Sequence, residues 1–310
     1  MTNPISISPL RQRMIEDMTA RGLGQQTQRG HIRACRRFAA YLKRSPETAT
    51  AEDVRLFQLH LMESGLTIQN RNRTMTGVRF LLRVTMRRLD LAAEIFHMKE
   101  PVKIPQILSA EEAKRLLMMA AKPQVRMLFS IGYGAGLRVS EVVKLKVKHI
   151  DSALGVIRVE QSKGKKDRQV MLSPETLDLL REWWTVRSKK YDRGVPVAER
   201  WLFPGRRKGL HLTPRQVTRL FHETVAAAGI RKKLTLHALR HSFATHLFDR
   251  GVDIRTIQAL LGHEKLEMTA RYTRVATGLI TAVESPLDQL AAPRRPTKRR
   301  KALPSGDTPA

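Results

Sequence analysis

Apolar side chains recur at helical spacing through the first hundred residues of the chain. The pattern predicts four helices: one after Ser8-Pro9, one from Thr27 to about Lys43, one after the capping box of Thr50 with Asp53, and one from Ile68 to about Arg88. In the second helix we expect four side chains to face inward, namely Ile32, Cys35, Ala39 and Leu42. Four short helices with apolar stripes can bury those stripes against one another, so the pattern predicts a small helical domain.

A short polar segment separates this region from the next. Residues 99–107 hold two prolines and three charged side chains with little apolar content, which is typical of a linker. We therefore expect one domain over residues 1–98 and a second over residues 108–290. Residues 291–310 are rich in proline and basic side chains, which predicts a disordered basic tail.

The second region combines helical patterns with two β-rich runs. Helices are expected after Ser109, over about Val125–Tyr133, after Ser173-Pro174 with Trp184 facing inward, after Thr213-Pro214, from His237 to about Gly251 and after Asp253. The runs Val156–Val159 and Arg168–Leu172 flank a charged turn and predict an antiparallel hairpin. The expected fold class is mainly α (α+β): a small N-terminal helical domain, then a mostly helical domain with a small antiparallel β-sheet.

The charge of the chain narrows the class of partner. Its 310 residues include 57 Lys and Arg against 28 Asp and Glu, for a net charge of +29. Such an excess indicates a polyanionic partner, first of all nucleic acid. Between Ile68 and Arg88 there are six arginines and no acidic residue, whereas a merely solvated helix usually mixes signs. We expect four of these side chains to contact DNA: Arg71, Arg73, Arg79 and Arg83.

Cysteine usage and hydropathy bear on the compartment. Cys35 is the only cysteine, so an intrachain disulfide is excluded, and its helical phase predicts a buried thiol. No apolar run approaches the roughly 18 residues needed to span a membrane. The expected location is cytoplasmic and nucleoid-associated, without a membrane partner.

Four side chains with complementary chemistry occur within forty residues, from Leu234 to Thr273. His237 and Arg240 are three residues apart and share one helix face. Arg is a planar fork for phosphate oxygens, His passes protons near neutral pH, and Tyr can be a covalent nucleophile. His263 and Tyr272 complete a set that suits chemistry at a phosphodiester.

A glycine-rich loop supplies a further arginine. In the sequence Gly134-Ala135-Gly136-Leu137-Arg138 the glycines end a helix and let the backbone approach a ligand closely. We expect Ser140 to cap the helix that follows.

Three pieces of the sequence together resemble the tyrosine recombinase family (phage integrase, Xer-like). The pieces are HALRHSFATHL at residues 237–247, LLGH at residues 260–263, and Tyr272 nine residues later. The resemblance implies a core-binding domain followed by a catalytic domain, and a site formed by Arg138, Lys163, His237, Arg240, His263 and Tyr272. It makes Arg138 a phosphate ligand and Lys163, in the hairpin turn, the general acid. Lys165 and Lys166 lie close enough to be alternatives for that role.

The implied reaction is transesterification. The phenol of Tyr272, with an ordinary pKa near 10, attacks a phosphate whose charge Arg138 and Arg240 offset. His263 donates a further hydrogen bond, His237 takes the phenolic proton or helps to bind the phosphate, and Lys163 protonates the departing 5′ oxygen. A 3′-phosphotyrosyl bond conserves the energy of the broken linkage, so we expect neither a metal nor a nucleotide cofactor.

The expected partners are double-stranded DNA with a specific recombination site and three further copies of the chain in a tetramer, with a related recombinase as another candidate. The apolar segment 277–290 would dock on a neighbouring protomer, as the resemblance implies. Two alternatives remain for the function: a type IB topoisomerase, which relaxes supercoils as a monomer, and a non-catalytic DNA-binding protein. For the histidines alone, a metal site of His237, His241 and His246 is the alternative. Chromosome dimer resolution and integration of a phage, transposon, integron or other mobile element all remain open as biological roles.

Overall fold

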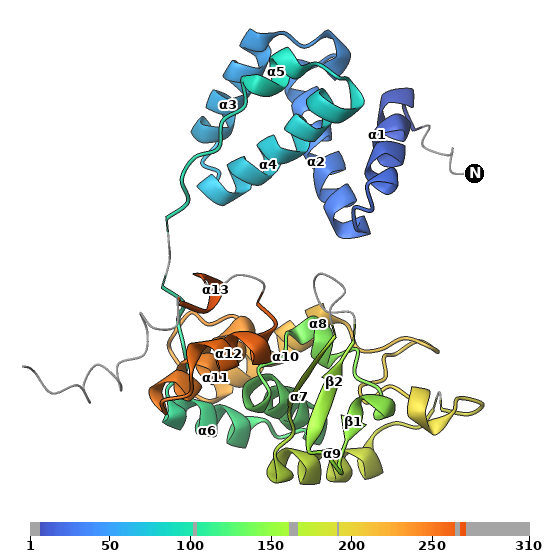
Figure 1. Cartoon of the computed structure of the whole chain (residues 1–310), viewed down its shortest axis with the longest axis vertical. Coiled ribbons are helices and arrows are strands. Elements are labelled where there is room, and N and C mark those ends of the chain that lie inside the picture. The colour runs from blue at the N-terminus through green and yellow to red at the C-terminus, as the bar shows by residue number, and fades with distance from the viewer. Residues whose placement is uncertain (1–6, 102–103, 161–166, 191, 264–266, 271–310) are drawn as a thin grey trace, which may run out of the picture. The chain divides into compact units, whose positions relative to one another are not determined.

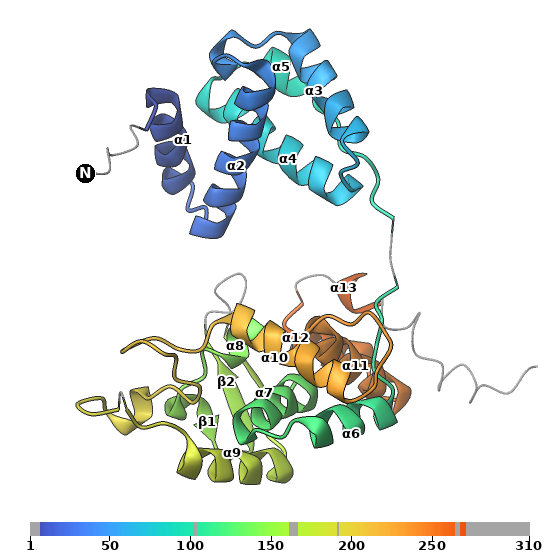
Figure 2. The ribbon, with the colours of Figure 1, turned by 180° about the vertical axis from the view of Figure 1, so that it is seen from behind.

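The computed structural model describes residues 7–101, 104–160, 167–190, 192–263 and 267–270. The chain divides into two compact units, Met1–Lys103 and Ile104–Ala310, and Figures 1 and 2 show their elements from two sides. The division falls inside the segment that the sequence predicts as a linker. The expected fold class, mainly helical with one small antiparallel sheet, is confirmed.

The first unit is entirely helical in its described residues. Its elements are α1 (Pro9–Ala20), α2 (Gln25–Leu42), the 3₁₀ turn Pro46–Thr48, α3 (Ala51–Glu63), α4 (Ile68–Phe80), the π-helical turn Leu81–Thr85 and α5 (Leu89–Ala93). The predicted capping box begins α3: Thr50 Oγ1 accepts from the Asp53 amide at 3.2 Å, and Asp53 Oδ2 accepts from the Thr50 amide at 2.7 Å. Such a cap stabilises a helix by about 1 kcal/mol.

The most deeply buried side of helix α2 is shifted from the expected one, although Ile32, Cys35 and Leu42 still pack against the core. Ala34 and Phe38 are the buried residues of this helix, while Ile32 and Cys35 are only partly covered. The reason is the close approach of α4, where a Cβ added to Gly77 would lie 2.7 Å from Ala34 Cβ. Partial cover still raises the pKa of the Cys35 thiol to about 12, which agrees with an unreactive thiol.

The fourth predicted helix is interrupted before Arg88. After Phe80 the chain widens into a π turn, in which the Met86 amide donates to Leu81 O at 2.9 Å. Arg87 then takes a left-handed conformation, with φ at +57°. The short α5, which the sequence analysis missed, follows and packs Leu91 and Ala92 into the core.

The second unit is mainly helical and packs one face of a small sheet into its core. Its elements are α6 (Ala110–Met119), α7 (Pro123–Gly134), α8 (Val139–Val142), β1 (Ile150–Asp151), β2 (Val156–Val159), β3 (Arg168–Met171), α9 (Pro174–Val186), α10 (Pro214–Ala227), α11 (His237–Asp249), α12 (Ile254–Leu261) and α13 (Glu267–Ala270), with 3₁₀ turns at Val147–His149 and Val197–Glu199. The strands pair antiparallel in the order β1-β2-β3, with Ile157 opposite Val170. The predicted hairpin is therefore present, and β1 extends it by a strand too short to be read from the sequence.

Helix α11 is fixed to the start of the unit by a buried hydroxyl. Ser242 Oγ accepts from the Leu108 amide at 2.8 Å and donates to Ala238 O at 2.7 Å. Helix α11 also packs closely against α7. A Cβ added to Gly132 of α7 would lie 3.2 Å from Leu239 Cδ1 of α11.

Trp184, which was expected to face inward, packs against the core only in part. Trp183 is the buried neighbour, stacks on Phe203 and donates its indole N–H to Leu202 O at 2.8 Å. Trp184 instead lies under the guanidinium of Arg187, 3.8 Å from its ring centroid.

In the part of the chain that the structure describes, no helix is long and apolar enough to cross a bilayer.

Candidate functional site

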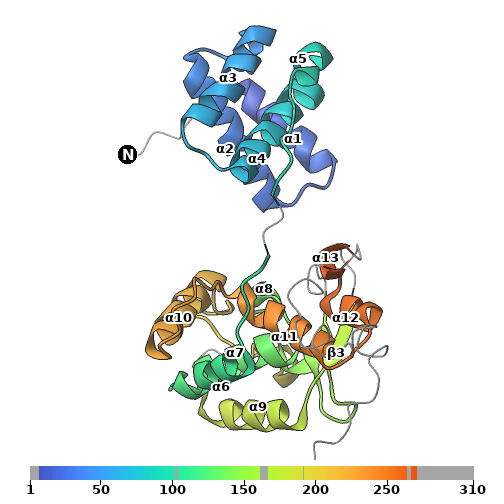
Figure 3. The same cartoon turned by 90° about the vertical axis from the view of Figure 1, so that its left-hand side faces the viewer.

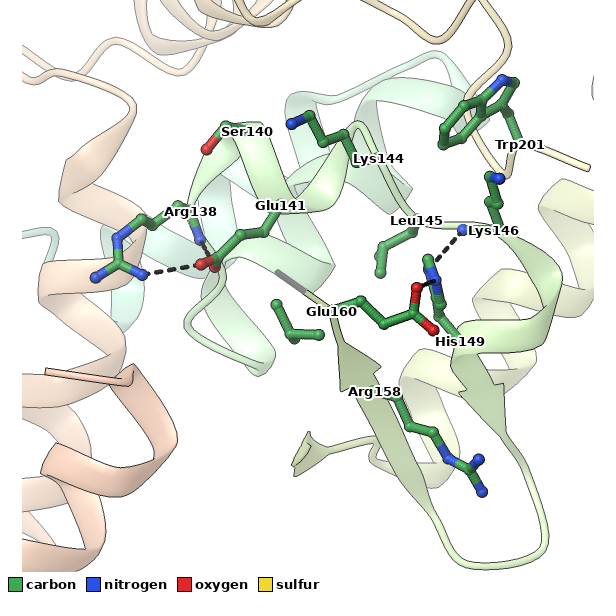
Figure 4. Close-up of a pocket in the computed structure, with 11 residues that line it drawn as sticks. Arg138, Ser140, Glu141, Lys144, Leu145, Lys146, His149, Arg158, Glu160 and Trp201 are labelled. Carbon is green, nitrogen blue, oxygen red and sulfur yellow. Dashed lines mark hydrogen bonds and ion pairs between the residues drawn. The ribbon is translucent and has the colours of Figure 1, made fainter. Parts of the chain in front are cut away.

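The carboxylate of Glu141 draws together three arginines that are distant in sequence. Arg138 Nη1 donates to Glu141 Oε1 at 2.8 Å, and Arg168 Nη2 donates to Glu141 Oε2 at 2.8 Å. Arg240 Nη1 lies 3.9 Å from the same Oε2. Figure 4 shows Arg138 and Glu141 pointing toward one another at the end of a pocket. Two of the three are the arginines that the motifs single out.

The capping residue of α8 differs from the expected Ser140. Glu141 Oε2 accepts from the backbone amide of Arg138 at 2.8 Å, while Ser140 lies exposed within the helix. One carboxylate therefore both caps the helix and holds the Arg138 guanidinium, which fixes the direction of that side chain.

The surroundings of Glu141 keep it ionised. Burial works against the charged form, but hydrogen bonding and charge from Arg168, followed by hydrogen bonds from Arg138, lower its pKa to about 2. One negative charge among three positive ones leaves the cluster positive overall, so it retains attraction for an anion.

Arg240 is buried and directed by two main-chain carbonyls. Its Nη1 donates to Gly136 O at 2.8 Å and its Nη2 to Leu261 O at 2.5 Å, and its side chain is 5% exposed. A planar guanidinium fixed in this way keeps one orientation without reorganisation. Arg240 therefore bonds both the loop that carries Arg138 and the C-terminal end of α12.

His237 begins α11 on the same side as Arg240. Partial burial of its ring, and then the charges of Arg240 and Arg138, lower its pKa, with Glu141 opposing them. Its ring meets that of His241 edge-on, with 6.1 Å between the centroids. A lowered pKa leaves the imidazole neutral at pH 7, and a neutral imidazole can accept a proton.

His263 directly follows Gly262, which ends α12 in a left-handed backbone conformation. Gly262 has a φ of +62°, and the amide of His263 donates back to Gln258 O at 3.1 Å. His263 Nδ1 lies 2.9 Å from Thr269 Oγ1 on α13. Because this hydroxyl holds one of the two ring nitrogens, it also sets the direction in which the other ring nitrogen points.

Two of the six predicted site residues lie outside the described residues. Lys163 falls in the chain segment between β2 and β3, and Tyr272 follows α13 by two positions. Among the described residues, the structure brings Arg138 and Arg240 together around Glu141.

Arg168 and Glu141 are the residues that sequence reasoning did not single out. The signal for Glu141 was its position three residues after Arg138, the spacing of an N-terminal helix cap. Arg168 carried no local signal, since its partners lie 27 and 92 positions away.

A pocket of about 470 Å³ extends from Arg138 toward Trp201, as Figure 4 shows. Basic side chains from the residues that follow α8 and from β2 line it: Lys144, Lys146 and Arg158. Lys146 donates to Glu199 Oε2 at 2.7 Å and lies 4.6 Å from the Trp201 ring centroid. His149 Nε2 lies 3.3 Å from Glu160 Oε2 at the base of the hairpin turn. The wall carries cations beside the arginine cluster, of which Lys146 is paired with Glu199 and Arg158 with Asp151.

The histidine metal site considered for the sequence has no support in the geometry. Among the described residues, no group of three or more His, Cys, Asp and Glu side chains is placed to hold a metal ion. His246 instead meets Tyr133, whose hydroxyl lies 2.8 Å from His246 Nδ1.

The four arginines proposed to contact DNA have different surroundings. Arg73 and Arg83 are exposed. Arg79 is partly covered and donates to Ile95 O in its own unit, and Arg71 lines an apolar cavity beside Met75 and Phe96. Exposure therefore favours Arg73 and Arg83 as DNA contacts.

Comparison with known proteins gives matches over both units. Residues 106–278 match the phage integrase family, and residues 10–89 match the phage integrase N-terminal SAM-like domain. A Sinorhizobium fredii protein named integrase/recombinase y4qK is 39% identical over 94% of this chain and 92% of its own length. The tyrosine recombinase XerA of Pyrococcus furiosus is 36% identical over 76% of this chain and 80% of its own.

A solved structure has a similar fold. The Tn1549 transposon integrase, in complex with circular intermediate DNA, superimposes with a TM-score of 0.70 at 19% identity, covering 85% of this chain and 94% of that one.

Proposed function

The chain belongs to the phage integrase family, and we propose that its arginine cluster holds the scissile phosphate of DNA for attack by Tyr272. The chain is a tyrosine recombinase, an enzyme of site-specific recombination that cuts and rejoins DNA strands. The family resemblance read from its motifs is thereby confirmed. The roles of individual residues form the proposal.

The observation that carries the proposal is the convergence of Arg138 and Arg240 on Glu141, at 2.8 and 3.9 Å. Glu141 orients Arg138, and two carbonyls orient Arg240, so both guanidinium groups are fixed before DNA binds. A phosphodiester beside them would meet prearranged donors for its non-bridging oxygens, which stabilises the added charge of a five-coordinate transition state.

The proposed step conserves atoms and charge. Tyr272 Oη forms a bond to phosphorus and gives its proton to His237, whose lowered pKa leaves it able to accept one. The bond between phosphorus and the 5′ oxygen breaks, and Lys163 supplies the proton for that oxygen. His263, oriented by Thr269, donates to a non-bridging oxygen. A 5′-hydroxyl of the partner strand reverses these transfers and releases Tyr272.

The partner is DNA, and the finer features of the assembly are part of the proposal. We propose a specific duplex site, bound by a tetramer in which segment 277–290 docks on the neighbouring copy. The two domains expected from the sequence, residues 1–98 and 108–290, act as core-binding and catalytic domains. A second, related recombinase could replace some copies. A substrate of this kind places the protein with the nucleoid, and a transposon integrase among the structural relatives supports a mobile element as one setting.

The alternatives are not favoured. The relatives that cover most of this chain carry the names integrase and recombinase, which agrees with strand exchange rather than with relaxation by a type IB topoisomerase. A non-catalytic binding protein would have no use for two fixed arginines beside a histidine of lowered pKa.

The proposal is tested with a duplex selected by the full chain from a randomised DNA pool. The selected site is rebuilt with a nick a few nucleotides to the 3′ side of the cleavage position. The short fragment that carries the new 5′-hydroxyl then diffuses away, and the covalent adduct accumulates. Wild type should form an adduct whose peptide, after digestion, carries a 3′-phosphate-linked nucleotide on Tyr272. Tyr272→Phe and Arg138→Ala should bind the duplex but form no adduct.

Relaxation of a supercoiled plasmid without the selected site is the contrasting measurement. Efficient relaxation of that plasmid would favour the topoisomerase alternative. An adduct formed by Tyr272→Phe at the wild-type rate would reject Tyr272 as the nucleophile.

A further inference from the structure

Arg168 connects three parts of the site with one guanidinium. Its Nη2 and Nη1 donate to the two oxygens of Glu141 at 2.8 and 3.1 Å, and its Nε donates to Leu260 O at 2.9 Å. The side chain is 9% exposed. Arg168 lies on β3, and Figure 3 shows this strand beside α12, against which it packs.

The last turn of α12 is held by two arginines. Arg168 takes the carbonyl of Leu260, and Arg240 takes the carbonyl of Leu261. Cations at the C-terminal end of a helix also complement the partial negative charge of its free carbonyls. The residue that follows this turn is Gly262, and a Cβ added there would lie 3.0 Å from Arg168 Cδ. The side chain of Arg168 is therefore packed against the position from which His263 departs.

We propose that Arg168 is a positioning residue of the recombinase: it directs Arg138 through Glu141 and directs His263 through the end of α12. It touches neither DNA nor the nucleophile in this role. The proposal rests on the proposed function, in which Arg138 and His263 contact the scissile phosphate. It adds that Arg168 sets the distance between these two side chains.

The geometry requires an arginine at this position. The side chain makes a two-pronged contact with the carboxylate of Glu141 and a third bond to the carbonyl of Leu260, and the planar fork of a guanidinium provides all three donors. A lysine retains the positive charge opposite Glu141 but concentrates its donors on one atom. Arg168→Lys therefore keeps the net charge of the cluster but loses the hydrogen bonds either to the Glu141 carboxylate or to the Leu260 carbonyl.

The experiment compares Arg168→Lys and Arg168→Met with wild type on the nicked duplex described above. Arg181→Met is the matched control, since Arg181 is exposed on α9 and paired with Asp178. Duplex affinity, thermal unfolding and single-turnover cleavage at saturating protein are measured for each. Affinity should remain within about twofold of wild type, while cleavage by Arg168→Lys should fall about a hundredfold, the scale of a misplacement of about 1 Å.

Two modified duplexes identify the group that Arg168 positions. In the first, a methylphosphonate at the cleavage position removes the negative charge that Arg138 offsets. The deficit of Arg168→Lys should shrink at least tenfold on this substrate. In the second, sulfur replaces the departing 5′ oxygen, so the leaving group needs no protonation. The deficit should persist there, because the proposed defect lies at the phosphate and not at the general acid.

Each outcome decides the proposal. Cleavage by Arg168→Lys equal to that of wild type, an unchanged deficit on the methylphosphonate, or full recovery on the sulfur substrate would overturn it. Failure of Arg168→Lys to fold at any temperature tested would also overturn it, because the residue would then be needed for the fold alone. Arg138→Ala distinguishes failure of the proposed function from failure of the role proposed for Arg168. If Arg138→Ala cleaves at the wild-type rate, the proposed site itself is wrong.

Discussion

Arg240 donates a hydrogen bond of 2.8 Å to the carbonyl of Gly136, a residue 104 positions earlier in the chain. The two residues belong to the two arginine motifs, so the main chain of the first motif directs the side chain of the second. Gly136 has a φ of +63°, and a Cβ added to it would lie 2.4 Å from Phe243 Cδ1 on α11. Backbone conformation and close packing both require glycine there.

Gly136→Ala should therefore destabilise the fold and impair cleavage together. The left-handed conformation costs an L-residue about 1 kcal/mol, and the collision with a buried ring adds about 1–3 kcal/mol. Denaturant unfolding should show a loss of at least about 2 kcal/mol, and cleavage of the nicked duplex should fall because the Gly136 carbonyl no longer directs Arg240.

Gly251→Ala is the matched control for this substitution. Gly251 has a φ of +81° with no atom within 4 Å of an added Cβ, so the variant carries the conformational cost without the collision. Equal losses of stability in the two variants would show that the packing against Phe243 contributes nothing.

The depressed pKa of Glu141 should appear in the acid unfolding of the protein. A carboxyl whose pKa falls from 4.5 to about 2 on folding contributes about 3 kcal/mol. Because the folded pKa is the lower one, this contribution is complete above about pH 4.5 and is lost as the pH falls toward 2. Wild type should lose more stability between pH 5 and pH 3 in urea unfolding than Glu141→Gln does.

Asp178→Asn provides the comparison, since the side chain of Asp178 is 72% exposed on α9. Its stability should follow that of wild type over the same pH range. Parallel curves for wild type and Glu141→Gln would mean that the arginines do not hold the carboxylate as described.

The local sequence pattern predicted where several helices begin and end, but it did not predict which faces of the helices pack together. The capping box at Thr50 and the glycine stop at Gly262 depend on neighbours within four residues, and both are present. The buried face of α2 was shifted because Gly77, more than forty residues away, lets α4 approach. A helical period cannot contain that information.

The same distinction separates the parts of the site. Arg138 and Arg240 were identified because motifs record their neighbours, whereas Arg168 has partners on α8 and α12 that only folding brings together. Ser140 was expected to cap the helix on residue type, but the Arg138 amide at the helix start donates instead to the carboxylate of Glu141, which also pairs with the Arg138 side chain. Tertiary charge pairing overrode the local preference.

His237 should set the acid limb of the pH profile of cleavage. Its pKa lies below the ordinary 6.5, so the neutral, proton-accepting form persists to lower pH and cleavage should decline only as the pH falls through that lowered value. Single-turnover rates at subsaturating protein report the free enzyme and are the measurement. His237→Gln should be slower at pH 7 and should lack this limb. An acid limb that is unchanged in His237→Gln would assign the base to another group.

The arginines of α4 and the following turn should separate into two classes by exposure. Arg73 and Arg83 are exposed, and within the described part of the chain neither has an ion pair or a hydrogen bond from its side chain. Arg73→Ala with Arg83→Ala should weaken binding of the selected duplex and lower the slope of log affinity against log salt by about 2, one for each phosphate that the double variant no longer neutralises. Unfolding should be unchanged.

Arg79→Ala should give the opposite pattern, because Arg79 donates to Ile95 O and holds the chain after α5 against α4. The loss of a hydrogen bond from a charged donor should lower the free energy of unfolding by about 1.5 kcal/mol, while the salt slope stays that of wild type. Arg55→Ala is the control for charge alone, since the exposed Arg55 is paired with Glu52 at 2.6 Å. If Arg55→Ala weakens duplex binding as much as Arg73→Ala with Arg83→Ala does, the attraction comes from the net charge of the protein and not from α4 and its following turn. If Arg79→Ala lowers the salt slope and leaves unfolding unchanged, Arg79 belongs with the DNA contacts, and its hydrogen bond to Ile95 gives way when the duplex binds.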